Sequence, residues 1–103
     1  LLSAVQAINM ATINGAKALG LDSLIGSIEI NKKADLISID LNSITAQPIY
    51  NPLSTLVYSS SRSDVDYVWI NGDIKLKDKK LINIDEDKII QIAKKWQTKI
   101  NQI

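Results

Sequence analysis

The stretch that decides the fold runs from residue 10 to residue 40 and reads MATINGAKALGLDSLIGSIEINKKADLISID. It predicts the end of a helix, a stop at Gly20, a connection that contains glycine, and a short apolar strand that closes at Asp40. Gly15 stands inside the helical part, where alanine would favour the helix by roughly 1 kcal/mol. We therefore expect another backbone to lie close to the helix at Gly15.

The residues before Gly20 predict one amphipathic helix over residues 2–19. Its inward face is defined by residues that recur at steps of three and four, namely Val5, Ile8, Thr12, Gly15 and Leu19. Gly20 is expected to end the helix in the left-handed conformation that a glycine adopts without strain. Beyond it, Ser27–Ile30 predicts a brief extended piece, and Asn31 stands in a turn that requires a positive φ.

Residues 34–41 alternate as a strand of a sheet that is buried chiefly on one side. Ile37, Ile39 and Leu41 point one way along it. Asp35 and Asp40 are five positions apart, an odd separation, so they lie on opposite faces and cannot form an acid–base pair. We expect the two carboxylates to cap turns at the strand ends.

A short helix is predicted over Pro52–Ser59. Asn51 is a good N-cap, and Pro52 suits the first helical position. The buried side of this helix is expected to carry Leu53, Leu56 and Val57. The serine run at residues 59–61 lacks the glycines of a phosphate loop, and we expect it to form a turn.

Val65–Lys77 predicts a β-hairpin around Asn71-Gly72, because both residues of that pair readily adopt the positive φ of a two-residue hairpin turn. Tyr67 and Trp69 lie on one face of the first strand. They are expected to pack in the core or across strands and not to bind a base or a sugar. Lys77 to Lys80 is expected to be a charged turn.

A C-terminal helix is predicted to begin at Asp85, its N-cap, with acids in the first turn and lysines towards the end. Its apolar stripe consists of Ile89, Ile92, Ala93, Trp96 and Ile100. Such a helix could bind a membrane surface. Its polar face carries charges of both signs, however, so we expect the helix to pack on the protein's own sheet.

The composition allows one modest domain: 103 residues, 46% hydrophobic, 22% charged and a net charge of +1. No basic surface is indicated, so we expect neither nucleic acid nor a membrane as a partner. The chain contains no cysteine and no histidine. This excludes thiolate and imidazole chemistry and a complete zinc hydrolase site, and it is compatible with a cytoplasmic location. The sequence therefore predicts no catalytic, cofactor-binding or metal-binding residue.

Two segments carry a resemblance, residues 11–40 (ATINGAKALGLDSLIGSIEINKKADLISID) and residues 51–74 (NPLSTLVYSSSRSDVDYVWINGDI). They resemble the C-terminal part of amidohydrolase-superfamily enzymes. The similarity is greatest to the subgroup of methylthioadenosine/S-adenosylhomocysteine deaminases and triazine-type chlorohydrolases. Asn31 stands where that family most often has glycine.

The resemblance implies an α+β piece of a larger fold. Residues 1–20 would be the last helix of a (β/α)8 barrel, residues 21–84 the C-terminal part of a composite β-sandwich, and residues 85–103 a closing helix. The chain begins at Leu1 and its only methionine is Met10, so we expect it to be part of a longer protein. The implied partners are the rest of that parent chain, which would supply the barrel and the N-terminal sandwich strands, and further copies in a homo-oligomer.

The implied activity belongs to the parent, a metal-dependent aminohydrolase that deaminates adenosine-type or related heterocycles with a water activated by zinc or another divalent metal. The family's metal ligands would all lie N-terminal to Leu1, so this piece would serve as a scaffold without a cofactor of its own. The alternative is a stand-alone, non-enzymatic α+β interaction module that adds a partner's strand to the hairpin or to an open sheet edge.

Overall fold

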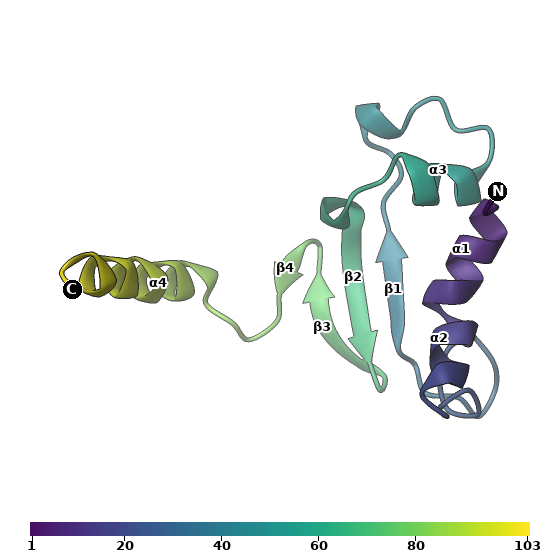
Figure 1. Cartoon of the computed structure of the whole chain (residues 1–103), viewed down its shortest axis with the longest axis horizontal. Coiled ribbons are helices and arrows are strands. Elements are labelled where there is room, and N and C mark those ends of the chain that lie inside the picture. Colours follow the sequence, from purple (N-terminus) through teal and green to yellow (C-terminus); the bar gives the residue numbers. More distant parts are fainter.

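A four-stranded antiparallel sheet forms the middle of the molecule, with helices beyond both of its edges (Figure 1). The computed structural model describes residues 1–103. The strands follow chain order across the sheet and are β1 (Leu36–Ile39), β2 (Val65–Ile70), β3 (Asp73–Lys77) and β4 (Lys80–Leu81). The helices are α1 (Ala4–Ala11), α2 (Ile13–Ala18), α3 (Pro52–Tyr58) and α4 (Glu86–Asn101), with 3-10 turns at Ile44–Ala46 and Arg62–Asp64. These elements confirm the predicted α+β class.

The helix predicted over residues 2–19 is wrong as a single element, because the structure breaks it at Thr12. Thr12 has φ −121° and ψ −99°, outside the helical region. Its hydroxyl donates a hydrogen bond to the carbonyl of Ile8 at 2.7 Å. A threonine hydroxyl that binds a carbonyl of the preceding turn often bends a helix. The spacing of apolar residues in the sequence does not indicate such a bond.

The helix ends agree with simple capping rules. At the start of α1, the Ser3 hydroxyl accepts from the Gln6 amide at 3.1 Å, and the Gln6 side chain accepts from the Ser3 amide at 2.8 Å. At the end of α2, Gly20 has φ +71°, as predicted. The amide of Leu21 donates to the carbonyl of Ala16 at 2.8 Å, and that of Gly20 donates to Lys17 at 3.0 Å. Both bonds satisfy carbonyls that the helix itself leaves free.

A close backbone approach occurs where the connection after α2 returns to the helix. Gly26 has φ +96°, and a Cβ placed on it would lie 2.7 Å from the Cβ of Ala16. The loop backbone therefore packs directly on α2, and Ala16 is one of the four buried residues of the chain. The separate backbone expected near Gly15 is absent: the only atom near the position of a Cβ there is the carbonyl oxygen of Met10, five residues earlier in the chain, at 3.2 Å.

The extended piece predicted at Ser27–Ile30 forms no strand: Ser27 is a bend, Ile28 and Glu29 are irregular, and Ile30 begins a turn. Side chains close that turn. The Ser27 hydroxyl donates to the carboxylate of Glu29, and the Lys32 ammonium lies 3.0 Å from the same carboxylate. The bond from Ser27, and then Lys32, hold the pKa of Glu29 below its usual value of 4.5. Asn31 has φ +73°, which confirms the predicted turn.

The hairpin of β2 and β3 forms as predicted, with φ +51° at Asn71 and +82° at Gly72. The charged turn that follows also has two positive φ values, at Asp78 and Lys79. It leads into β4, a short strand that the sequence did not indicate. On the other side, β1 pairs antiparallel with β2, with Leu36 opposite Trp69 and Ser38 opposite Tyr67.

Helix α3 confirms the N-cap prediction, because the Asn51 side chain accepts from the amides of Leu53 and Ser54 at 3.0 and 3.4 Å. Its buried side agrees with the prediction in part. Leu56 and Val57 are half-buried, but Leu53 is exposed and the one buried residue is Thr55. The amides of Ser59 and Ser60 both donate to the carbonyl of Thr55, so the serine turn folds over that residue.

The chain buries very little of itself: only Ala16, Ala46, Thr55 and Asp64 are buried out of 103 residues. Its radius of gyration is 17.8 Å, against about 13 Å for a compact domain of this length. The prediction that the C-terminal helix packs on the sheet is wrong. The connection after β4 leads α4 away from the sheet (Figure 1), and no residue of α4 is buried.

Two glycines with positive φ allow a matched test of the loop packing. Gly20→Ala should lower the free energy of unfolding by about 1 kcal/mol, the cost of a Cβ at positive φ. Gly26→Ala should lower it by a further ~1–3 kcal/mol, because its Cβ would also overlap Ala16. Urea unfolding followed by tryptophan fluorescence measures both changes. Equal losses for the two variants would contradict the close approach.

Candidate functional site

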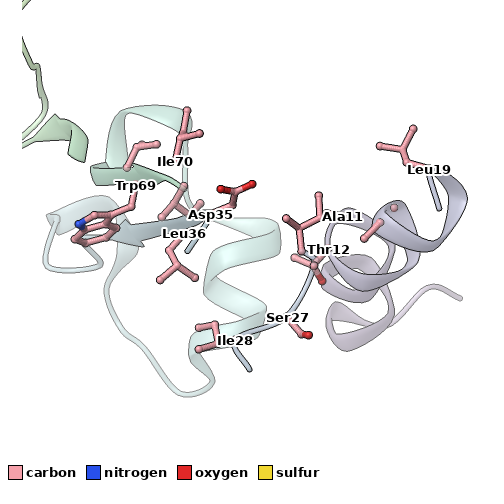
Figure 2. A pocket seen from close by; sticks show the side chains of 15 residues that line it. Ala11, Thr12, Leu19, Ser27, Ile28, Asp35, Leu36, Trp69 and Ile70 are labelled. Atoms are coloured by element: carbon pink, nitrogen blue, oxygen red, sulfur yellow. The ribbon is translucent and has the colours of Figure 1, made fainter. Parts of the chain in front are cut away.

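An open apolar groove lies between helices α1 and α2 and strands β1 and β2 (Figure 2). Its volume is about 690 Å³, and ten of its fifteen lining residues are hydrophobic. Figure 2 shows Ala11 and Thr12 on the helix side and Leu36 and Trp69 on the sheet side. We call this hollow the helix–sheet groove. Its apolar lining suits packing against another apolar surface better than chemistry on a polar substrate.

The acidic side chain in the helix–sheet groove, Asp35, is already used by the fold. Its carboxylate accepts a hydrogen bond of 2.7 Å from the amide of Asn71, in the hairpin turn. Next to it, the amide of Gly72 donates to the carbonyl of Ala34 at 3.0 Å. The start of β1 therefore holds the turn between β2 and β3 through both a side chain and the backbone.

Asp40, at the other end of β1, accepts from the amide of Asn42 at 2.9 Å. The two aspartates thus occupy opposite ends of the strand and bind turn amides, which confirms their predicted capping role. β1 covers Leu36–Ile39 and is shorter than the predicted strand over residues 34–41. Ile37, predicted to lie on the covered face, is 58% exposed in this chain.

The two aromatic side chains of β2 pack on each other along the same strand and are half-buried, whereas the sequence predicted packing in the core or across strands. The rings of Tyr67 and Trp69 are stacked with their centroids 5.6 Å apart and an interplanar angle of 14°. The Tyr67 hydroxyl donates to the carboxylate of Asp78 at 2.9 Å, and this bond, with burial and the negative charges nearby, raises the pKa of Tyr67. The pair joins the face of β2 to the turn before β4.

The described residues contain no group of three or more His, Cys, Asp or Glu side chains that could hold a metal ion. Since the chain has neither histidine nor cysteine, its residues do not fit a zinc site.

One oxygen of Asp66 is buried without a hydrogen-bond partner. No helix combines the length and the apolar character needed to cross a bilayer. The chain as it stands offers packing surfaces and no assembled reaction centre.

Comparison with known proteins identifies the family. The profile of the amidohydrolase family matches residues 1–75, most of the chain. The chain belongs to the amidohydrolase family.

Among curated members of the amidohydrolase family, one similar relative is a 5-methylthioadenosine/S-adenosylhomocysteine deaminase of Teredinibacter turnerae. It is 42% identical over 99 residues, which are 96% of this chain and 22% of the relative. The chain thus spans less than a quarter of the length of that deaminase.

Solved structures of this kind have the same fold. An adenosine deaminase from Xanthomonas campestris with bound zinc matches 99% of this chain and 23% of its own, with a TM-score of 0.91 and 39% identity. An atrazine chlorohydrolase from Arthrobacter aurescens complexed with zinc matches 90% of this chain and 20% of its own, with a TM-score of 0.81 and 22% identity. The second likeness concerns the fold alone. The resemblance to deaminases and chlorohydrolases that residues 11–40 and 51–74 indicate is thereby confirmed.

The contact of Asp35 with Asn71 can be tested against a neighbouring aspartate. Asp35→Ala should lower the free energy of unfolding by about 1–3 kcal/mol, because the Asn71 amide loses its charged acceptor. Asp73→Ala, at an exposed position beside the same turn, should change it by less than about 0.5 kcal/mol. Urea unfolding of both variants gives the comparison. A larger loss for Asp73→Ala would show that Asp35 does not hold the turn.

Proposed function

We propose that this chain is the C-terminal structural part of a metal-dependent aminohydrolase that deaminates adenosine-type or related heterocyclic substrates. The observation that carries the proposal is the likeness, over almost the whole chain, to a zinc-bound adenosine deaminase structure at 39% identity. The deaminase relative at 42% identity supports the same substrate class. Chlorohydrolase activity has weaker support, since that likeness is limited to the fold.

The chain contains no histidine and no cysteine, and this decides which part of the parent would carry the catalytic groups. Because its residues do not fit a zinc site, the metal ligands and the catalytic groups would lie in the other part of the parent polypeptide. In this proposal residues 1–20 are the last helix of the parent's barrel, residues 21–84 are its share of a composite β-sandwich, and residues 85–103 are the closing helix. The piece supports the reaction by holding the fold together.

The exposed apolar surface of the chain supports a role as one part of a larger protein. The helix–sheet groove exposes an apolar lining, and only four residues are buried. The unpartnered oxygen of Asp66 would gain a donor when another segment packs there, since an unpaired buried carboxylate oxygen is unfavourable. We propose that the barrel and N-terminal sandwich strands of the parent cover the groove. The proposal also includes a homo-oligomer of the parent.

A stand-alone interaction module, the alternative function, would need a core of its own. Four buried residues, two of them alanines, do not provide one. We find no observation that favours this alternative.

The proposal predicts two properties of the isolated chain. The purified 103-residue polypeptide should neither deaminate adenosine, 5-methylthioadenosine or S-adenosylhomocysteine nor retain stoichiometric zinc after dialysis, because it has no imidazole or thiolate ligand. An ultraviolet deamination assay and elemental analysis measure these properties. The matched control is the full-length parent with zinc, which should deaminate at least one of the three substrates. Deamination or bound zinc in the isolated chain would overturn the proposal, as would an inactive parent.

A further inference from the structure

Helix α4 presents one narrow apolar stripe and lysines along one side of it. At about 100° per residue, Ile89, Trp96 and Ile100 lie in the middle of the stripe, and Ile89, Ile92, Trp96 and Ile100 are between 47% and 63% exposed. Lys88 and Lys99 follow the stripe along one border, and the Lys99 ammonium lies 4.9 Å from the centre of the Trp96 ring. A stripe of this width is typical of a helix that packs on one surface.

The position of α4 is the same in a related enzyme, although little within this chain holds it. No residue of α4 is buried. The structure of the Xanthomonas campestris adenosine deaminase nevertheless matches 99% of the chain with a TM-score of 0.91. So high a score over the whole chain requires α4 to stand in about the same place relative to the sheet. A lone helix on a short connection would not keep its place, so a surface outside residues 1–103 must hold it.

Charge argues against a second α4 as that surface. If two α4 helices packed antiparallel, their lysine borders would face each other, because the same side of each helix meets its counterpart. If they packed parallel, the acidic first turns with Glu86 and Asp87 would lie side by side. Both arrangements bring like charges together at the edge of an apolar contact, which is unfavourable.

We infer that α4 docks through its stripe on the part of the same polypeptide outside residues 1–103, at an apolar surface bordered by carboxylates that face Lys88 and Lys99. The chain spans only 23% of the Xanthomonas campestris structure, so most of such a polypeptide is available to form that surface. This inference rests on the proposed function only in taking the chain as part of a protein as long as its relatives. In this inference α4 holds residues 1–103 against the rest of the same polypeptide.

Hydrogen exchange of the α4 amides in the full-length polypeptide tests the inference. Trp96→Glu should reduce their protection on the order of 100-fold, because a charge replaces the largest side chain of the docked stripe. Gln91→Glu, on the opposite side of the helix, is the matched control and should leave protection unchanged, and Trp96→Leu should retain most of it. Ile100→Ala is the milder variant should Trp96→Glu not fold, with a loss on the order of 30-fold.

The charged border has a test of its own. Lys88→Glu combined with Lys99→Glu should lower protection about tenfold, because the new carboxylates would face the proposed ones. Unchanged protection in this double variant would contradict the acidic border.

Three results would overturn the docking: α4 amides in the wild-type protein that exchange as fast as those of a free peptide, equal losses for Gln91→Glu and Trp96→Glu, or a smaller number of subunits for Trp96→Glu in sedimentation. The last result would assign the stripe to a second copy. A wild-type protein with protected α4 amides but no deaminase activity would remove the proposed function and leave this inference standing.

Discussion

The contact between Gly26 and Ala16 sets the distance between the helices and the sheet. The chain leaves α2, turns back so closely that a Cβ on Gly26 would overlap Ala16, and only then enters β1. Because the loop backbone touches the helix, β1 starts at a fixed distance from α2, and the space that remains between them is the helix–sheet groove. The shape of the helix–sheet groove follows from that one approach.

The sequence predicted the elements that depend on local chemistry. Asn51 caps α3, Asn71-Gly72 closes the hairpin and Gly20 ends α2, because each signal acts within a few residues of its own position. The capping roles of Asp35 and Asp40 were foreseen for the same reason, although Asp35 turned out to bind an amide 36 residues away. The family could also be predicted, since its signature lies in two continuous segments.

The features that the sequence did not predict arise from competition or from tertiary contacts. Thr12 breaks a helix because its hydroxyl binds the carbonyl of Ile8, a choice that apolar periodicity does not encode. Residues 27–32 form no strand, and contacts among the side chains of Ser27, Glu29 and Lys32 hold them instead. The apolar stripe of α4 indicates a helix that packs on a surface, but a stripe does not say which surface. The groove likewise brings together residues as distant as Ala16 and Trp69.

The bond between Asp35 and Asn71 has a consequence for the order of folding. During synthesis β1 leaves the ribosome before the hairpin that completes it, and 36 positions separate the two partners. Until that hairpin arrives, β1 is an unpaired apolar edge, the type of segment on which nascent chains aggregate. Residues 36–71 must therefore leave the ribosome before the carboxylate of Asp35 can bind the hairpin turn.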